Sequence, residues 1–327
     1  GMAASYAVAL DPWANHVAAS RANQISIFDL NSSEEVKLID PHLAALKFEE
    51  REMYPGGASH RDFVHSLAFH PNGRLLASGG FRVVKLWEQP QNVQITKSPL
   101  GGVAADIDVN FAKQLAAFGT QQNFVTVRSL TDGKEIRKLE GHTGPVSGVA
   151  LTVDGSQVVS GSQDKTLRIW SLESGQVTRQ IETPSPIHDL CLTIDGKEII
   201  SAHDDAIIRV WTFAAPETAP AEGEAEKPVR EIKGHSQPVR SLALILPTGL
   251  QLLSGSDDNT ARVWTVANGA AVRSLNHGGP VVSVAARPDG LFLASASSNN
   301  TAKLWEAANG KQIAELRGYL PSQQADL

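Results

Sequence analysis

A short apolar phrase that ends in an aromatic residue recurs along this chain of 327 residues. Its six copies are ISIFD (25–29), VVKLW (83–87), LRIW (167–170), IIRVW (207–211), ARVW (261–264) and AKLW (302–305). If FVTVRSL around Arg128 is a degenerate seventh copy, the key positions are 28, 87, 128, 170, 211, 264 and 305. Four of the six intervals are 41 or 42 residues, and the intervals of 59 and 53 residues then contain insertions of about 18 and 12. A period of this length, marked by tryptophan, predicts an all-β, seven-bladed β-propeller of four-stranded antiparallel blades.

The fourth repeat shows how each blade is built. Its apolar segments 146–151, 156–160 and 166–171 are strands, and turns follow at Asp154-Gly155 and at Ser174-Gly175, which leads into a fourth strand. Glycine supplies the positive φ that such hairpin turns require. Equivalent turns that end in glycine recur in the other repeats. By symmetry these turns share one face of the ring. The loops between blades, and those between second and third strands, share the other face.

These repeats resemble the WD40-repeat family from residue 5 to residue 318, and the compact ASGG and SGSxD turns are similar to those of bacterial WD40 modules. The resemblance implies a hydrogen-bonded tetrad in each blade: a histidine before the first strand, a serine on the second, an aspartate in the next turn and the third-strand tryptophan. Blade four carries His142, Ser160, Asp164 and Trp170, and blade six carries His235, Ser254, Asp258 and Trp264. Blade seven has His277, Ser295 and Trp305 with Asn299 for the aspartate, and blade five has Ser201, Asp205 and Trp211 with Thr183 for the histidine. Blade two keeps His60, Ser78 and Trp87 on a shortened turn, while blades one and three have lost most of the tetrad.

The period places one domain at residues 3–318, followed by a tail at 319–327. The expected blades are 5–40, 61–98, 101–140, 142–182, 184–233, 235–275 and 277–317. An inter-blade insertion at 41–60 is expected to be either a lid or packing filler. A second insertion, 214–228, is rich in Ala, Pro and Glu and too polar to offset the entropy of ordering it, which predicts a flexible hairpin tip. We expect the ring to close by packing of blades one and seven, without an exchanged strand.

A serine, a histidine and an aspartate in one blade resemble a hydrolase triad. Here the trio recurs at the same register in several blades, whereas a catalytic site occurs once, so we interpret it as structural. The chain has no G-x-S-x-G elbow, H-E-x-x-H pair, G-x-x-x-x-G-K-[ST] loop or C-x-x-C pair. Its single cysteine, Cys191, lies in an inner strand, which predicts a buried and inert thiol. We therefore expect no catalysis, no cofactor and no bound metal.

Charge and hydropathy restrict the partners. The formal charge is −6, and residues 214–228 contribute four glutamates against one lysine. Nucleic acid is not favoured as a partner, because its affinity for proteins depends on clustered cations. No apolar run approaches the roughly 18 residues of a membrane span, and nothing after Met2 has the basic start and apolar run of a signal peptide. We expect a monomer without a membrane partner; the compartment stays open, with the cytoplasm favoured.

In WD40 proteins, partners most often contact two positions on the narrow face. One is the residue after the first apolar residue of the inner strand: His65, Ala104, Ser147, His188, Arg240 and Val282. The other is the residue before the turn aspartate: Gln163, Asp204, Asp257 and Ser298. By this register, His188, Asp204, Arg240 and Asp257 form a charged cluster near one rim. Either this cluster recognises a partner, with Arg240 on a carboxylate and the aspartates on a basic group, or its charges only pair with one another. His203 adjoins Asp204 and, if exposed, titrates near neutral pH.

Two functions from different classes remain. The first is a non-catalytic protein–protein interaction scaffold that binds a protein or peptide partner on the narrow face. The alternative is a small-molecule-binding or catalytic propeller that uses the central channel, which requires acids or histidines converging from several blades. Only His65, His188 and Arg240 are inward candidates in this sequence, and we expect no pair of carboxylates beside them. The scaffold is therefore favoured.

Overall fold

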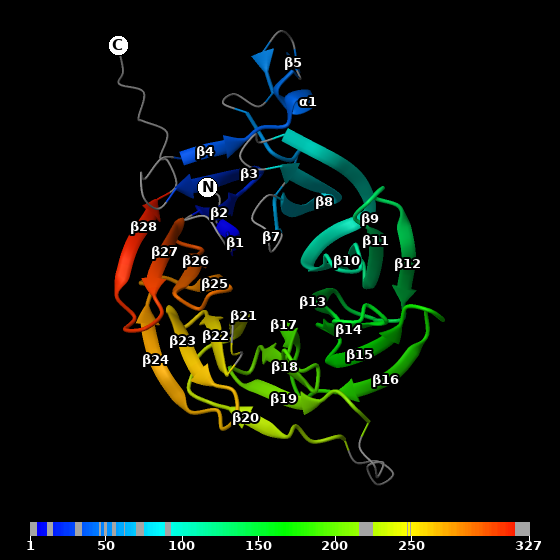
Figure 1. The fold of residues 1–327 in the computed structure, drawn as a ribbon, viewed down its shortest axis with the longest axis vertical. Coiled ribbons are helices and arrows are strands. Elements are labelled where there is room, and N and C mark those ends of the chain that lie inside the picture. The colour runs from blue at the N-terminus through cyan, green and yellow to red at the C-terminus, as the bar shows by residue number, and fades with distance from the viewer. Residues whose placement is uncertain are drawn as a thin grey trace.

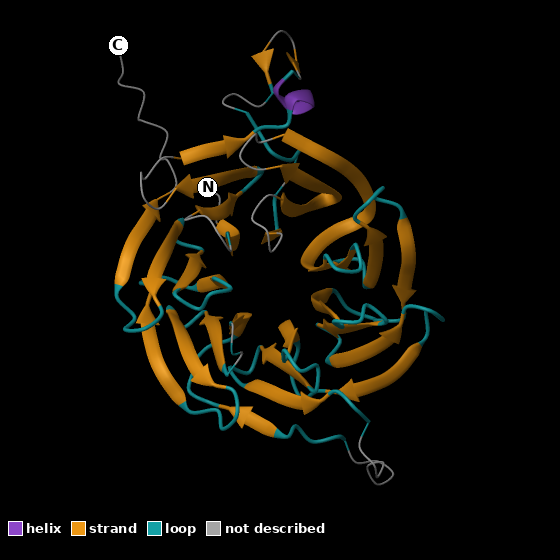
Figure 2. Cartoon of the chain, in the orientation of Figure 1, coloured by secondary structure: helices purple, strands orange, loops and turns teal. Residues whose placement is uncertain are grey.

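The computed structural model describes residues 5–11, 16–29, 35–45, 47–48, 51–53, 57–61, 63–69, 75–88, 93–215, 225–246, 248 and 250–317. Its strands form a ring of seven blades around a central channel (Figure 1). In each blade the antiparallel strands run in order from the channel to the perimeter (Figure 2). The predicted all-β propeller is confirmed.

Five blades are separate four-stranded sheets whose strands follow chain order. Blade one contains β1 (Ser5–Leu10), β2 (His16–Arg21), β3 (Gln24–Asp29) and β4 (Glu35–Leu38). Blade four contains β13 (Val146–Leu151), β14 (Gln157–Ser162), β15 (Thr166–Ser171) and β16 (Val177–Glu182). Blade five contains β17 (Ile187–Leu192), β18 (Glu198–His203), β19 (Ile208–Thr212) and β20 (Arg230–Ile232). Blade six contains β21 (Val239–Ile245), β22 (Gln251–Ser256), β23 (Thr260–Thr265) and β24 (Ala271–Asn276). Blade seven contains β25 (Val281–Ala286), β26 (Phe292–Ser297), β27 (Thr301–Glu306) and β28 (Gln312–Arg317).

Blades two and three share one continuous sheet. Its strands are β7 (Ser66–Phe69), β8 (Leu75–Glu88), β9 (Val93–Asn110), β10 (Leu115–Thr120), β11 (Phe124–Ser129) and β12 (Glu135–Glu140). Strand β8 supplies two blade positions, because its first half pairs with β7 and its second half with β9. Strand β9 in turn leaves blade two and becomes the inner strand of blade three, where it pairs with β10. The boundary expected between residues 98 and 101 therefore lies inside a strand, since no loop separates these two blades.

The insertion after blade one contains a helical turn, α1 (Pro41–Ala44), and a small hairpin of β5 (Lys47–Phe48) and β6 (Arg51–Glu52). These elements project outward from the perimeter of the ring (Figure 1). At the base of the insertion, Lys85 Nζ donates to the Asp40 carboxylate and to the Ser59 carbonyl. The Lys85 and Asp40 side chains are only 2% and 0% exposed. The described part of the insertion is thus fixed to the ring edge by a buried ion pair and does not lie over the channel as a lid.

The apolar core lies between neighbouring blades. One cluster joins Val125, Val127 and Leu139 of blade three to Val158 and Trp170 of blade four. The second strand of a blade contributes most, because β14, β22 and β26 are buried along almost their whole length. Each blade therefore covers the face of the next, and no blade buries its own apolar surface alone.

The ring closes by packing between blades one and seven. Val8, Leu10 and Val17 lie in one buried cluster with Ala296 and Leu304. Strand β1 pairs only with β2, and β28 only with β27, so the described residues contain no exchanged strand. Residues 1–4 and 318–327, where such a strand would have to start or end, lie outside the described residues. Within the described ranges, the expected closure without an exchanged strand is what the structure shows.

Arginines in three outer strands fasten one blade to the next. Each lies third in its strand and donates to carbonyls in the last turn of the following blade. They are Arg137, with acceptors Leu172 and Glu173; Arg179, with acceptors Thr212, Phe213 and Ala214; and Arg273, with acceptors Ala307 and Ala308. Blade seven has Ala314 at this position, and the alanine side chain has no donor for such a bond.

Arg179 also contacts the described end of the second insertion. Its guanidinium forms an ion pair with Glu226, and the two side chains are 10% and 18% exposed. The described end of the 214–228 segment is therefore docked on blade four at Glu226, while the flexible tip stays a prediction. Residues 216–224 lie outside the described residues.

Arg179→Ala is expected to lower the free energy of unfolding by about 1–3 kcal/mol, because three carbonyls and a largely buried carboxylate lose their donor. Urea denaturation monitored by tryptophan fluorescence measures this change. Deleting 214–228 should reproduce part of the loss, because it removes Glu226 and the Ala214 carbonyl but leaves the Thr212 and Phe213 carbonyls in place. Lys227→Ala, a change beside Glu226 that spares the ion pair, serves as the control. A deletion that leaves the melting temperature unchanged would contradict docking.

Candidate functional site

The two complete tetrads have the same geometry. In blade four, His142 Nε2 lies 2.8 Å from Ser160 Oγ and His142 Nδ1 lies 2.8 Å from Asp164 Oδ2, while Trp170 Nε1 donates to Ser160 Oγ at 2.8 Å. Burial opposes ionisation of Asp164, but hydrogen bonds from His142 and Thr166 outweigh it and hold the pKa of this carboxyl below its usual value. The serine is buried beneath the tryptophan and not directed into a pocket. The arrangement stiffens the blade and does not expose a nucleophile.

Blade six repeats this geometry with its own four residues. His235 lies 2.7 Å from both Ser254 Oγ and Asp258 Oδ2, and Trp264 Nε1 donates to Ser254 Oγ at 2.8 Å. Burial lowers the pKa of His235, although Asp258 partly offsets this effect. A constellation that recurs in two blades at one register fits the structural interpretation.

In blade seven the tetrad histidine has the opposite ring orientation, so that Nδ1 and not Nε2 faces the serine. His277 Nδ1 lies 2.7 Å from Ser295 Oγ, and His277 Nε2 lies 2.8 Å from Thr301 Oγ1. The Thr301 hydroxyl in turn donates to Asn299 Oδ1 at 2.6 Å, so the asparagine reaches the histidine only through Thr301. Trp305 Nε1 still donates to Ser295 Oγ, at 2.9 Å.

Blade five replaces the missing histidine from within its own second strand. His203 Nε2 lies 2.8 Å from Ser201 Oγ, and its Nδ1 lies 3.0 Å from the Ser185 carbonyl. Residues two apart on a strand share a face, so the spacing Ser-Ala-His was the signal for this substitution. His203 is fully buried, and burial is the main cause that lowers its pKa to about 4. The expectation of titration near neutral pH is therefore wrong.

The remaining tetrad residues of blades five and two form only part of the complete hydrogen-bonded set. Asp205 forms a two-pronged ion pair with Arg209, at 3.0 and 2.7 Å, and does not contact a histidine. Blade two keeps the remaining set, since Ser78 Oγ lies 2.8 Å from both His60 Nε2 and Trp87 Nε1.

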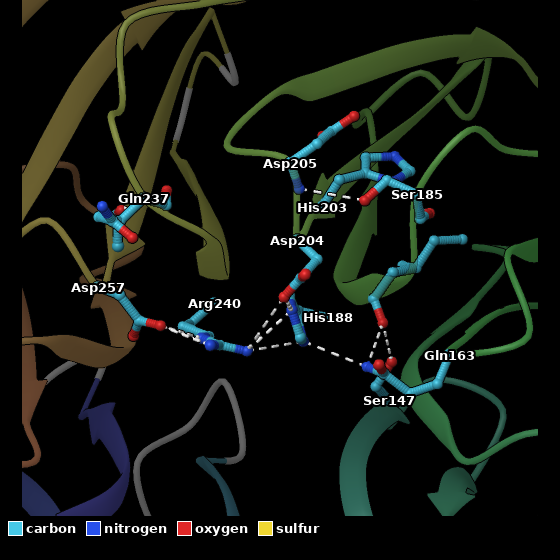
Figure 3. Close-up of polar contacts among 12 residues, drawn as sticks. Ser147, Gln163, Ser185, His188, His203, Asp204, Asp205, Gln237, Arg240 and Asp257 are labelled. Atoms are coloured by element: carbon cyan, nitrogen blue, oxygen red, sulfur yellow. Dashed lines mark hydrogen bonds and ion pairs between the residues drawn. The ribbon is translucent and has the colours of Figure 1, made fainter.

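A polar network at the rim of blades four to six contains most of the predicted contact residues (Figure 3). We define the rim network as Ser147, Gln163, His188, Asp204, Arg240 and Asp257. The same backbone hydrogen bond positions members of this network in each of the three blades. The prolines that precede the inner strands accept from the first amide after the second strand, as in Gln163 N to Pro145 O at 2.9 Å and Asp257 N to Pro238 O at 3.0 Å. This bond holds each loop residue beside the second residue of the inner strand.

Arg240 and His188 join the two sides of the rim network. Arg240 Nε donates to Asp257 Oδ2 at 2.8 Å, and Arg240 Nη1 lies 2.8 Å from His188 Nε2. The same His188 nitrogen lies 2.9 Å from Asp204 Oδ1. On the other side, Gln163 Nε2 lies 3.2 Å from His188 Nδ1. The charges of the cluster therefore do pair with one another, as one of the two interpretations expected.

The described contacts of His188 are compatible with one neutral tautomer. Burial lowers its pKa, Asp204 partly offsets this effect, and Arg240 lowers the pKa further, so the ring is neutral near pH 7. A neutral ring protonated at Nε2 donates to Asp204, and its Nδ1 is then the acceptor that faces Arg240 Nη1 at 3.3 Å and Gln163 Nε2 at 3.2 Å.

The other predicted contact residues lie outside the rim network. His65 borders the channel and Ser298 is exposed in blade seven. The prediction for blade three was out of register by one residue. Val149 N donates to Asp106 as Leu242 N does to Asp189, so the counterpart of His188 is Ala105 and not the buried Ala104.

Sequence analysis missed three carboxylates in the wall of the central channel, a space of about 860 Å³. Asp106 and Asp108 of β9 accept from Val149 N and Leu151 N, each at 2.7 Å. Asp189 of β17 accepts from Leu242 N at 2.7 Å. These bonds fasten one inner strand to the next. The expectation that only His65, His188 and Arg240 are inward candidates is therefore wrong, and the alternating Asp-Ile-Asp of an inner strand was the signal for two of these carboxylates.

Burial controls the ionisation of these channel groups. It raises the pKa of Asp106 to about 7, and it raises the pKa values of Asp108 and Asp189 as well, with Asp106 adding to the shift of Asp189. Cys191 is half-buried at the channel wall, not fully buried as expected. Burial, together with Asp189 and Asp108, raises the pKa of this thiol well above its usual value. The thiol therefore stays protonated and a poor nucleophile.

The described residues contain neither a cluster of metal-ligand side chains nor a helix that could span a membrane. No three His, Cys, Asp or Glu side chains in those ranges form a group that could hold a metal ion. No helix among them has the length and apolar character needed to cross a membrane.

The chain is a repeat propeller. This structural class follows from its ring of blades and its recurring tetrads. Five segments match the family model WD40, described as WD domain, G-beta repeat: residues 57–88, 133–171, 175–212, 226–265 and 269–306. Because they make up more than half of its residues, the chain belongs to the WD40 family. Propellers of this family serve in general as non-catalytic scaffolds for protein interactions.

Similar curated proteins share parts of the propeller. The nuclear distribution protein nudF 1 of Talaromyces marneffei is 31% identical over 130 residues, which cover 38% of this chain and 28% of that protein. The nuclear distribution protein PAC1 of Arthroderma otae is 26% identical over 223 residues, which cover 64% of this chain and 37% of that protein. An uncharacterized WD repeat-containing protein, sll1491 of Synechocystis, is 33% identical over 123 residues, which cover 36% of this chain and 34% of that protein. Each alignment therefore spans well under half of the relative's length.

Proposed function

We propose that this propeller is a non-catalytic interaction scaffold that binds a protein or peptide partner on its narrow face, at the rim network of blades four to six. The observation that carries the proposal is the exposure of charge in this network. Asp204 is 51% exposed, Arg240 32% and Asp257 25%. These side chains belong to no tetrad and to no apolar cluster between blades. They lie where the fold itself does not require charge.

The pairing of these charges supports the proposal and does not oppose it. Exposed ion pairs contribute only about 0–1 kcal/mol, so a partner that offers better-placed groups displaces them at little cost. Charge at a rim also speeds encounter and selects among partners. In contrast, the channel carboxylates are already bonded to backbone amides, which favours a structural role over catalysis.

Arg240→Ala combined with Asp257→Ala is expected to abolish capture of the partner while leaving the fold unchanged. The reason is that the double change removes one arm of the rim network and leaves the tetrads untouched. Affinity capture from the source cell, quantified by mass spectrometry, measures the effect. Lys134→Ala with Asp132→Ala is the matched control, because it removes one cation and one carboxylate from an exposed pair on the opposite face.

Another outcome would assign partner binding to the inter-blade insertion and not to the rim network. If capture survives the double variant but is lost when 43–54 is replaced by a glycine-serine linker, the inter-blade insertion is the recognition element. Capture that survives both changes would contradict the proposal.

A further inference from the structure

The arginines that fasten neighbouring blades differ in whether a carboxylate reaches them. Arg179, between blades four and five, binds the Glu226 carboxylate of the second insertion as well as carbonyls of blade five. Arg137, between blades three and four, donates from Nε to the Leu172 carbonyl and from Nη2 to the Glu173 carbonyl. Within the described ranges no carboxylate pairs with Arg137, and its Nη1 has no acceptor. One guanidinium edge of Arg137 is therefore open to an anion.

A groove of about 600 Å³ lies beside this arginine, between blades three and four. Both residues whose carbonyls Arg137 contacts line the groove, so its guanidinium lies at the groove edge. Leu115 and Leu172 line it with apolar atoms, and both are half-buried against the cluster between the two blades. Thr178 of β16 also lines the groove. We call this site the Arg137 groove. Its volume lies within the roughly 300–1,000 Å³ that is typical of ligand sites.

A second cation flanks the Arg137 groove. The stem of Lys113 lies against Gly155, a lining residue, since a Cβ added at Gly155 would be 2.7 Å from Lys113 Cγ. Lys113 is exposed, and none of the described carboxylates pairs with it. Of the described lining residues Glu173 alone is acidic, and its carboxylate does not pair with Arg137. Asp154, beside Gly155, uses its carboxylate within its own turn. The groove thus combines apolar atoms with two cations that lack counter-charges, which attracts an acidic ligand.

The next groove around the ring shows what such a ligand does. Phe213 and Leu172 each follow the third-strand tryptophan of their blade by two residues, and Arg179 donates to the Phe213 carbonyl as Arg137 does to that of Leu172. In that groove Glu226 binds Arg179, and only 18% and 10% of these side chains stay exposed. Blade four has no insertion at the equivalent place, because a tight turn at 172–176 joins β15 to β16. Arg137 therefore stays exposed.

We propose that the Arg137 groove binds an acidic peptide segment of a partner protein. A glutamate or aspartate of this segment binds Arg137 at Nη1, and a neighbouring aliphatic side chain packs against Leu115 and Leu172. Additional acidic residues of the segment lie toward Lys113. The groove is on the face of the hairpin turns, opposite the rim network, so it is a second site and does not depend on the function proposed for the rim.

The test begins with a random peptide library, which is depleted on the Arg137→Gln protein and then selected on the immobilised wild-type protein at low ionic strength. The selected peptides are expected to share an acidic residue within two or three positions of Leu, Ile or Val. Replacement of that residue by its amide should weaken binding about tenfold, as measured by fluorescence anisotropy. Affinity should also fall as salt is added, because exposed charges are screened.

Variants of the protein locate the binding site. Arg137→Gln is expected to weaken binding of the selected peptides about tenfold, and Lys113→Gln about twofold. Glu173→Gln should retain or tighten binding, because it removes a like charge from the groove. Arg273→Gln is the matched control, since Arg273 makes the same kind of carbonyl bonds between blades six and seven. An equal loss of binding in the two arginine variants would show that these residues act through the stability of the ring, and it would overturn the inference.

Further outcomes also decide the matter. Selected peptides without an essential acidic residue, or a library that yields no binder dependent on Arg137, would overturn the inference. Self-association of the wild-type protein in sedimentation that disappears when 214–228 is deleted would show that the acidic insertion of a second copy fills the groove, and it would overturn a separate partner. The combined Arg240→Ala and Asp257→Ala variant should bind the selected peptides as the wild type does, so failure at the Arg137 groove leaves the proposed function intact.

Discussion

Trp170→Ala is expected to lower the free energy of unfolding by about 3–5 kcal/mol. The indole is 1% exposed and packs in the apolar cluster between blades three and four, so its removal leaves a cavity. It also removes one of the hydrogen-bond partners of the buried Ser160 hydroxyl. Guanidinium denaturation followed by circular dichroism measures the change, because five other tryptophans would complicate fluorescence.

A matched variant separates tetrad loss from the loss of any aromatic residue. Phe28 occupies the equivalent strand position in blade one, is half-buried and belongs to no tetrad. Phe28→Ala should therefore cost clearly less. A loss below about 1 kcal/mol for Trp170→Ala would show that the tetrad does not stabilise the blade.

Lys85→Ala is expected to be comparably damaging, at about 3–5 kcal/mol, because it removes a buried positive charge that pairs with the fully buried Asp40 carboxylate. The Ser59 carbonyl loses a donor at the same time. Since this ion pair ties the inter-blade insertion to blade two, amide hydrogen exchange should increase from Asp40 to His60. Chemical denaturation and exchange measured on the same variant test both effects.

Replacement of both partners gives the control. The combination of Lys85→Met and Asp40→Leu removes both buried charges and fills the space with apolar atoms, so it should lose much less stability than Lys85→Ala. An equal loss in the two variants would mean that the site needs charge for another reason. Little loss in either would mean that the pair is not buried in solution.

The features predicted from the sequence are those in which local pattern determines the outcome. Trp170 and Trp264 mark the third strands of their blades. The repeat length of about 41 residues then locates the serines and histidines of the complete tetrads relative to them. The arrangement at His188 and Arg240 also followed, because register alone puts second residues of neighbouring inner strands at one rim. Whether that rim binds a partner is a separate question, and the sequence analysis left it open.

What was missed depends on contacts that cross from one blade to another. The ion pair of Lys85 with Asp40 and the carbonyl bonds of Arg179 join segments more than 30 residues apart. The channel aspartates were not identified, because a polar residue in an inner strand was not assigned to the channel wall. Blade five was predicted to have Thr183 in place of the tetrad histidine, and the substitute, His203, was not identified because it comes from another strand of the same blade.

The closure of the ring also has a consequence for synthesis of the chain. Val8 and Val17 leave the ribosome early, but the buried cluster that covers them is completed only by Ala294 and Leu304. Roughly 280 residues separate these two groups of side chains in the sequence. Because the ribosome adds about 5–20 residues per second, the apolar face of blade one stays uncovered for on the order of tens of seconds. During that interval the nascent propeller is an open arc with one uncovered end. The ring therefore closes only when blade seven has folded. Until then the chain exposes apolar surface that favours aggregation and that chaperones can cover.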